Sequence, residues 1–249
     1  MHRIIIGLIL LLAPCKVFAV CSSPCVQSAS LVHNNGTVVS LAYPSNNTAG
    51  NLLVIVAAYG NNGALPTDTR GNSWTNELRI FGAGALITDI WYVCNASAGA
   101  NTVTLTMPTG NQFYAALQIY EFTGNLTSLC VDHAISNSST STVATSSKSI
   151  STNGSVSRST ELVLAVFNGN HGSVASITSG AGQSDALMTV TTVSFQSVCL
   201  TSTLNATSGL SGVQTMTATS NVNATDWTTE IVAFKLGASA PVASRSKIL

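Results

Sequence analysis

The run GNLLVIVAAYGNN, residues 50–62, holds eight consecutive apolar or aromatic residues between clusters of Gly and Asn. A short continuous apolar run that ends in turn-forming residues predicts a strand buried on both faces. A related run, TELVLAVFNGNHG at residues 160–172, starts 110 positions later and ends in a similar Asn/Gly cluster. Both runs therefore predict central strands of a β-sheet.

Other segments recur at a similar spacing. NASAGANTVTLT (95–106) pairs with NATSGLSGVQTMT (205–217) when one inserted residue is allowed. A shift of 114 pairs LQIYEF (117–122) with IVAFKL (231–236), which places Lys235 at the position of Glu121. Internal similarity at a fixed period predicts a duplicated supersecondary unit, with halves at residues 26–124 and 136–237.

The fold class follows from the scarcity of helical periodicity and the abundance of short runs bounded by Gly, Asn, Pro and Ser. TVTLTM (102–107), for example, places Val103 and Leu105 on one face and threonines on the other. We expect an all-β protein, an antiparallel two-sheet sandwich of jelly-roll or immunoglobulin-like type, built from the two duplicated halves. The alternative is a pair of tandem immunoglobulin-like domains.

The Ser/Thr-rich segment 136–160 bears on these alternatives. Its composition suits a flexible spacer between domains. However, it aligns with the leading segments of the first half, and Val143, Ile150 and Val156 punctuate it. We interpret it as solvent-facing strands, which favours a single sandwich over residues 20–237, followed by a flexible tail at 238–249.

Residues 1–19 have the pattern of a secretory signal peptide: a positive start at His2 and Arg3, an apolar stretch, and small residues before Val20. The apolar stretch is shorter than the roughly 20 residues that span a bilayer. We expect a secreted, extracytoplasmic chain with no membrane span after cleavage.

Charged residues make up only 7% of the chain, against roughly 25% in ordinary globular proteins. Without Arg3 and Lys16, seven basic residues remain against nine acidic ones, a net charge near −2. This balance excludes the basic surface of a nucleic-acid-binding protein. Ser, Thr and Asn fill the polar positions, and Thr in particular suits exposed strand faces.

Five cysteines follow the predicted cleavage site, and disulfides are the default in an oxidising compartment. We expect Cys21 to pair with Cys25, and Cys94 with Cys130. Zinc is the alternative for CSSPC (21–25), but no other ligand pair stands nearby at metal-binding spacing. The odd fifth cysteine favours self-association through a bond between chains.

The order NTAGNLLVIVAAY, DTRGNSWT, IWYVCNASAGANTVTLT and IYEFTG resembles a group of exported bacterial β-sandwich proteins. The shared pattern is an aliphatic strand after Gly-Asn, an Asp-x-x-Gly-Asn-x-aromatic turn, a Thr-Val-Thr strand and a Glu-Tyr-Ser-Gly-like strand. The chain differs by Cys94 where Ala is usual, and by Phe122-Thr123 where Tyr-Ser is usual. The resemblance spans roughly residues 26–237 and implies the fold, but no activity.

The turn DTRGNSW (68–74) is the sharpest candidate for ligand binding, through Asp68, Asn72 and Trp74. Asp68 and Asn72 could offer oxygen atoms to calcium, but a calcium loop usually gathers several carboxylates, and this turn has one. A hairpin in which Asp68 caps its own backbone is favoured. Trp74 is the best candidate for stacking on a sugar ring. Trp91 is expected in the core, and Trp227 at a rim.

Catalytic patterns are weak. The chain has neither a Gly-x-Ser-x-Gly elbow nor a His-Glu-x-x-His motif. Asp132 and His133 are neighbours, and on a regular strand they would point to opposite faces. Glu121 is a carboxylate within an apolar strand, with an expected structural role at a sheet edge or on a turn.

We therefore expect a non-catalytic protein without a metal or other cofactor, acting in adhesion, surface display or structural assembly with a polysaccharide or cell-surface partner. A carbohydrate-binding module is the alternative, and a glycan-acting hydrolase ranks below it.

Overall fold

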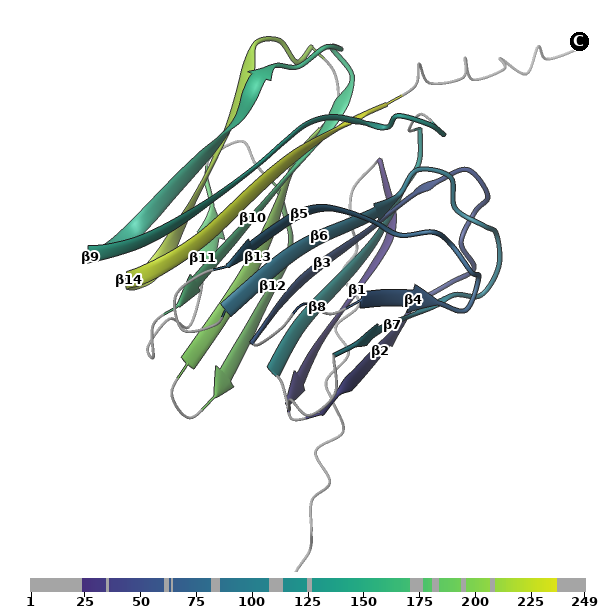
Figure 1. The fold of residues 1–249 in the computed structure, drawn as a ribbon. Helices are drawn as coiled ribbons and strands as arrows, with labels where there is room; N and C mark the ends of the chain where they lie inside the picture. The colour runs from purple at the N-terminus through teal and green to yellow at the C-terminus, as the bar shows by residue number, and fades with distance from the viewer. Residues whose placement is uncertain are drawn as a thin grey trace, which may run out of the picture.

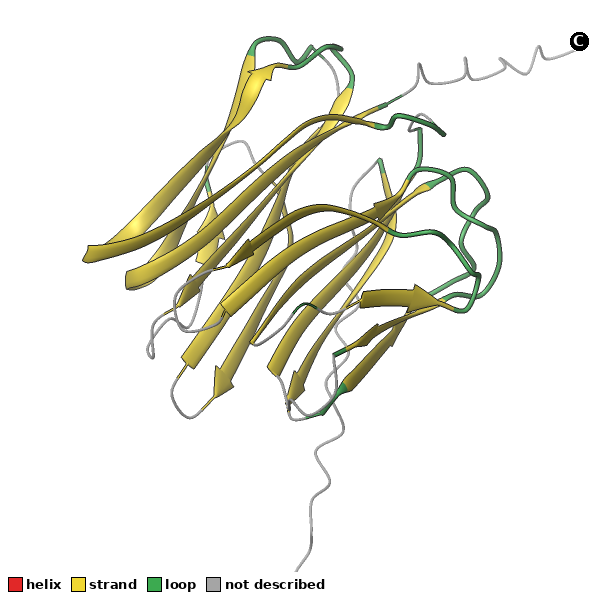
Figure 2. Cartoon of the chain, in the orientation of Figure 1, coloured by secondary structure: helices red, strands yellow, loops and turns green. Residues whose placement is uncertain are grey.

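The computed structural model describes residues 24–34, 36–60, 63, 65–81, 86–107, 114–124, 127–170, 177–180, 184–193, 196–206 and 209–236. Within these ranges the chain forms β-strands joined by turns and bends, without a helix (Figure 2). The strands form several antiparallel sheets. The all-β prediction is confirmed. The predicted signal peptide and tail lie outside the described residues.

The first sheet has five strands in the order β1-β8-β3-β6-β5 (Figure 1). They are β1 (Cys25–Asn34), β3 (Leu52–Gly60), β5 (Thr75–Phe81), β6 (Leu86–Val93) and β8 (Tyr114–Phe122). β3 is the central strand, as the run at 50–62 predicts. Its alternating side chains are fully buried on both faces, with Leu52 and Val54 on one side and Leu53 and Ile55 on the other.

A three-stranded sheet packs on one face of the first sheet. Its strands are β2 (Val38–Ala42), β4 (Leu65–Asp68) and β7 (Thr102–Thr106), in the order β2-β7-β4. β7 alternates as predicted, since Val103 and Leu105 are buried in an apolar cluster shared with β3, β6 and β8. On its outer face Thr104 forms a 2.8 Å hydrogen bond with Ser40 of β2.

The remaining strands form one sheet in the order β11-β14-β10-β13-β12, with β9 also paired to β14. They are β9 (Val131–Ser155), β10 (Glu161–Asn170), β11 (Ile177–Ser179), β12 (Ser184–Val193), β13 (Gln196–Ala206) and β14 (Val213–Lys235). Most of the Ser/Thr-rich segment 136–160 belongs to β9, so its interpretation as strand rather than spacer is confirmed.

β9 and β14 form a long two-stranded ribbon whose register shifts between Thr219 and Asp226. The last part of β14 lies between β10 and β9, whereas its first part pairs with the end of β9 and with β11. Side chains from both parts, including Met216 and Ile231, pack in one apolar cluster with the Val163 face of β10. The last part of the ribbon therefore extends the sheet of β10, and its first part packs against the Val163 face of that sheet.

The strand order recurs in the two parts of the chain. The order β1-β8-β3-β6-β5 in the N-terminal part (residues 24–124) matches β9-β14-β10-β13-β12 in the C-terminal part (residues 127–236). Likewise, β2-β7-β4 matches β9-β14-β11. The register also shifts at Val26 of β1 and at Asp132 of β9, where each residue is skipped in the pairing with the neighbouring strand.

A further apolar cluster joins the two parts. It contains the Leu52 face of β3, residues of β6 and β8, and the Leu162 face of β10 with residues of β14. Figure 1 shows the first sheet between the three-stranded sheet and the C-terminal strands. In the part of the chain that the structure describes, no helix has the length and apolar character to cross a membrane.

The predicted disulfide between Cys94 and Cys130 is confirmed, with Cα atoms 5.8 Å apart. It ties the end of β6 to the segment that enters β9, and so connects the N-terminal and C-terminal parts. Cys25 is also disulfide-bonded. Its predicted partner, Cys21, lies outside the described residues, and that pairing stays a prediction.

Candidate functional site

The Asp68–Trp74 turn is organised by a single carboxylate. Asp68 Oδ1 accepts hydrogen bonds from the backbone N–H groups of Arg70 and Asn72, both at 3.0 Å. Its Oδ2 accepts from the side chains of Asn72 at 2.7 Å, Trp74 at 3.2 Å and Asn101 at 3.2 Å. The turn itself occupies both oxygen atoms of Asp68, as the hairpin interpretation expects.

The three tryptophans do not form an open aromatic face. Trp74 is half-buried against the cluster below the three-stranded sheet, and its indole N–H is held by Asp68. Trp91 is in the core, as expected, with 7% of its surface exposed. The expectation of a rim position for Trp227 is wrong: it is 1% exposed, because it packs into the cluster between the two layers of the C-terminal part.

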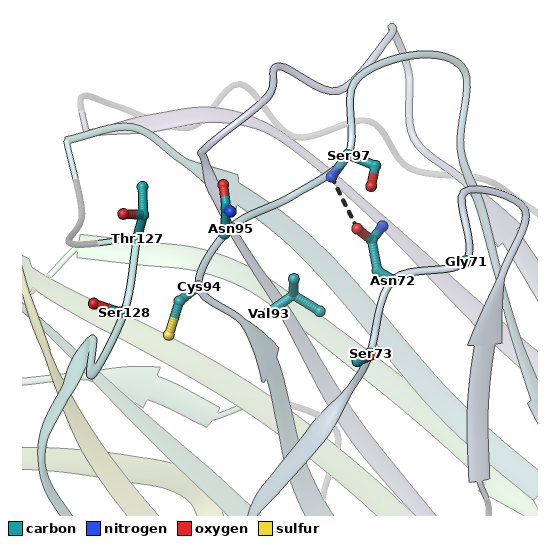
Figure 3. A pocket seen from close by; sticks show the side chains of 9 residues that line it. All are labelled: Gly71, Asn72, Ser73, Val93, Cys94, Asn95, Ser97, Thr127 and Ser128. Atoms are coloured by element: carbon teal, nitrogen blue, oxygen red, sulfur yellow. Dashed lines mark hydrogen bonds between the residues drawn. The ribbon is translucent and has the colours of Figure 1, made fainter.

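A pocket of about 360 Å³ lies beside this turn and the Cys94–Cys130 disulfide (Figure 3). Asn72 joins two of its walls, because its Oδ1 accepts a 2.9 Å hydrogen bond from the backbone of Ser97. The described lining has no charged group and no aromatic ring, and it combines amides and hydroxyls with apolar surface, including Val93. It consists of Gly71, Asn72, Ser73, Val93, Cys94, Asn95, Ser97, Thr127 and Ser128.

This lining could bind a neutral polar group through amides and hydroxyls. It holds no carboxylate, imidazole or amine for acid–base chemistry. Of the three predicted ligand residues, the structure places Asn72 in the pocket wall, Asp68 beneath the turn, and Trp74 against the core.

Glu121 is a fully buried carboxylate that anchors a loop. Its oxygens accept hydrogen bonds from the side chains of Gln27, Asn47 and Asn51 and from the backbone N–H of Thr48. The expected structural role on a turn is therefore confirmed, but not at a sheet edge, because β8 lies between β1 and β3. With four donors, this carboxylate is committed to holding the 47–51 loop.

Asp89 forms a second buried polar group, which the sequence did not single out. Arg79 binds both of its oxygens at 2.7 Å, and Tyr59 and Trp91 also donate to it. The hydrogen bond with Asp89 raises the pKa of Arg79 despite its partial burial. The Arg79 guanidinium also lies 5.6 Å from the Trp91 ring centre. This group stabilises β5 against β6.

Asp132 and His133 do not point to opposite faces. Val131 pairs with Phe234 and His133 with Ala233, so Asp132 is an extra residue in a β-bulge. A bulge breaks the simple alternation of side chains. The His133 Nε2 atom consequently lies 3.4 Å from Asp132 Oδ2.

Two further strands bring charges to this bulge. Lys235 of β14 places Nζ 3.4 Å from Asp132 Oδ1. Ser157 donates to Asp132 from its backbone N–H and its hydroxyl, both at 2.7 Å, and its hydroxyl lies 3.3 Å from Glu161 Oε1. We refer to Asp132, Glu161 and Lys235, with Ser157 and His133, as the bulge cluster.

Glu161 is the most buried member of the bulge cluster, with 0% of its surface exposed. Its Oε1 accepts a 2.9 Å hydrogen bond from the backbone of Arg158, while Oε2 is buried without a hydrogen-bond partner. Burial raises the pKa of Glu161, and the negative charge of Asp132 raises it further. Burial also acts to raise the pKa of Asp132, but its hydrogen bonds, chiefly from Ser157, bring it below the usual value.

The sequence alignment misplaced Lys235. In the strand register, Leu52 pairs with Phe122, and Leu162 pairs with Phe234. When Leu52 and Leu162 are matched, Lys235 corresponds to Thr123 and not to Glu121. A shift of two residues keeps every side chain on the same face, so the apolar pattern did not reveal the error.

Among the described residues, no three His, Cys, Asp or Glu side chains are grouped so as to hold a metal ion. Comparison of the chain with protein-family models, with curated proteins and with solved structures finds no match.

Proposed function

We propose that this chain is a secreted, non-catalytic β-sandwich that acts in adhesion, surface display or structural assembly. The observation that carries the proposal is the hydrogen bonding of three carboxylates, of which Glu121 and Asp89 are buried and Asp68 is half-buried. Glu121, Asp68 and Asp89 are each bound by several donors from neighbouring loops or strands. Groups committed in this way stabilise a scaffold and are poorly placed to exchange protons with a substrate.

The sandwich and the duplication are parts of the same proposal. The recurring strand order and the bulges at Val26 and Asp132 support two related halves. The apolar cluster that joins the first sheet to β10 and β14 supports a single body rather than two independent modules. The resemblance to exported bacterial β-sandwich proteins agrees with this architecture and with an extracytoplasmic location.

Carbohydrate binding is the second candidate, and the pocket beside the Asp68–Trp74 turn is the observation that favours it. Sugar hydroxyls pair well with amides and hydroxyls such as those of Asn72, Asn95 and Thr127. The half-buried position of Trp74 weighs against it, because a stacked sugar ring needs an open aromatic face.

Titration of the purified exported chain with a panel of polysaccharides separates the two candidates. Thr127→Val removes a pocket hydroxyl with little change in shape, and Thr123→Val is a matched control on an exposed residue outside the pocket. Saturable binding that is lost only in Thr127→Val would favour the carbohydrate-binding module. We expect no glycan binding in any of the three proteins.

Sedimentation velocity over a wide protein concentration range then tests assembly directly. A structural or self-associating protein should form larger species as its concentration rises. Turnover of any glycan in the panel would contradict the non-catalytic proposal. A strictly monomeric protein that binds neither glycans nor cell surfaces would contradict adhesion and assembly together.

A further inference from the structure

The bulge cluster places an amine, a carboxyl group and a second, buried carboxyl group on three adjacent strands. Lys235 of β14 lies directly opposite Glu161 of β10, and Asp132 occupies the bulge of β9 on the other side of β14. Lys235 Nζ is 3.4 Å from Asp132 Oδ1, an ion-pair distance that holds the amine beside the carboxyl group.

We propose that Lys235 and Asp132 become joined by an isopeptide bond, an amide between Nζ and Cγ, with Glu161 as the proton-transfer group. Glu161 is suited to this role because the Ser157 hydroxyl joins it to Asp132, at 3.3 Å from Glu161 Oε1 and 2.7 Å from Asp132 Oδ1. Its second oxygen, Oε2, is buried without a hydrogen-bond partner. An amide linkage of this kind is a covalent modification of the chain that needs no cofactor and no oxidant.

The reaction balances within these three side chains. Lys235 passes one ammonium proton to the Asp132 carboxylate that it contacts, which leaves a neutral amine beside a neutral carboxyl group, while Glu161 is protonated. The neutral amine attacks Asp132 Cγ, and the C–N bond forms. The Cγ–O bond breaks as Glu161 gives its proton, through the Ser157 hydroxyl, to the departing hydroxyl, which leaves as water. Glu161 finally regains a proton from the new nitrogen, so one ammonium and one carboxylate become one amide and one water.

The surroundings of Asp132 favour attack at its carbonyl carbon. Ser157 N–H donates to Oδ2 at 2.7 Å. The two ring nitrogens of His133 lie 2.8 Å from Asn153 Oδ1 and from the carbonyl oxygen of Ser155. The Ser157 N–H therefore stabilises the negative charge that develops on Oδ2 during attack. Asp132 is only 7% exposed in its side chain, and a site with little water strengthens these interactions.

Burial and the negative charge of Asp132 both raise the pKa of Glu161, which favours the protonated form that this role requires. The N-terminal part offers an internal comparison. The register places Val26, Asn51 and Thr123 where the C-terminal part has Asp132, Glu161 and Lys235. That set has neither amine nor carboxyl group, so the proposed bond is specific to the C-terminal part.

Such a bond would join β9 to β14 and close a loop of about 100 residues, which restricts the unfolded chain strongly. The inference does not depend on what the protein binds, since a cross-linked strand pair can serve any of the functions proposed above.

Intact mass spectrometry of the full exported chain, after reduction of its disulfides and denaturation, tests the proposal. We expect a mass lower than the sequence mass by one water. Peptide mapping should yield a branched peptide that joins Lys235 to Asp132. An unmodified mass would overturn the proposal, as would a water loss confined to a linear peptide containing Asp132, which indicates a succinimide.

Substitutions of Lys235, Asp132 and Glu161 test the role of each residue in the proposed bond. Lys235→Arg and Asp132→Ala should each restore the full sequence mass. Glu161→Gln should also do so while the protein still forms the Cys94–Cys130 disulfide, which serves as a check of folding. Lys148→Arg, a change to a lysine of β9 that has no contact with Asp132 among the described interactions, should keep the water loss. Full bond formation in Glu161→Gln would exclude Glu161 as the proton-transfer group.

Discussion

A carboxylate holds the loop before β3 in the N-terminal part and the loop before β10 in the C-terminal part, but the two carboxylates come from different strands. In the N-terminal part, the N–H of Thr48 before β3 is bound by Glu121, which comes from β8. In the C-terminal part, the N–H of Arg158 before β10 is bound by Glu161, which comes from the start of β10 itself. A carboxylate is placed at both loops, but it is supplied by a different strand in each.

This difference gives Glu121 and Glu161 different surroundings. Glu121 is surrounded by neutral donors from Gln27, Asn47 and Asn51. Glu161 instead lies beside a second carboxylate and a lysine. The same strand arrangement therefore holds a carboxylate whose oxygens are fully hydrogen-bonded in one part. In the other part it holds the three groups for which we propose a reaction.

The largest expected effect on stability comes from removing the Glu121 carboxylate. Glu121→Ala removes the acceptor of four buried or partly buried donors, and each unsatisfied donor costs about 1–3 kcal/mol without full additivity. We expect the free energy of unfolding to fall by about 4 kcal/mol, measured by urea denaturation. Glu161→Ala, in a Lys235→Arg background where no amide bond can form, should cost about half as much. An equal fall in the free energy of unfolding for the two variants would contradict the different roles given to Glu121 and Glu161.

The disulfide provides the next largest effect, because it joins the two parts. The double variant Cys94→Ser, Cys130→Ser opens a cross-link with a sequence separation of 36. The restriction of the unfolded chain by such a loop is worth about 4 kcal/mol. We expect that loss in urea denaturation under non-reducing conditions, with the wild type measured in parallel, so that the disulfide of Cys25 stays intact in both proteins. A negligible loss would show that the shared apolar cluster alone joins the parts.

A third prediction compares positions on the two central strand pairs. Val56 pairs with Gln118, and Val166 pairs with Glu230. Glu230 is fully buried, and neither of its carboxyl oxygens has a hydrogen-bond partner. Burial raises its pKa well above the model-compound value, and Asp89 adds to the rise while Arg79 opposes it.

The sign of the pH effect follows from that shift. The folded state keeps Glu230 protonated where the unfolded state ionises, so stability falls as pH rises above about 4.5, by up to about 1.4 kcal/mol per pH unit. Glu230→Gln should remove this slope, so that its stability advantage over the wild type grows as pH rises above about 4.5 and is small near pH 4. Urea denaturation at several pH values measures it, and an unchanged slope would contradict the prediction.

The smallest effect is expected where the two parts are most alike. Ser40 and Thr104 form a hydroxyl pair on the outer face of the three-stranded sheet, and Ser151 and Thr215 form one on the β9–β14 ribbon. Exposed cross-strand pairs contribute about 0.5 kcal/mol. Ser40→Ala and Ser151→Ala should each shift the thermal midpoint only slightly and by similar amounts. A large shift in one alone would reveal an undetected role for that face.

Features that depend on local pattern were predictable from the sequence. The double-faced burial of β3 follows from its continuous apolar run, and the alternation of β7 from the side-chain period of two. The strand character of segment 136–155 was predicted from its alignment with the first half and from its scattered apolar residues. The Cys94–Cys130 bridge was also expected. Trp227 was misplaced because its burial comes from packing with residues of β9, β10 and a distant part of β14, which no local pattern records.

The bulge cluster could not be found in this way. Asp132 and Lys235 are separated by most of the C-terminal part, and only the pairing of β9 with β14 brings them together. The bulge also reverses the expected direction of Asp132 relative to His133. A two-residue error in register, as in the match of Glu121 with Lys235, leaves the apolar pattern intact and the chemistry wrong.

The sequence by itself determined that this chain is built from strands, and which of them are buried on both faces. These properties are local, because they arise from side-chain alternation and from the residues that end each run. The tertiary structure alone decided which carboxylates are saturated and which lie beside a lysine. That outcome depends on strand register and on a bulge, where the displacement of one residue changes every partner of a charged side chain.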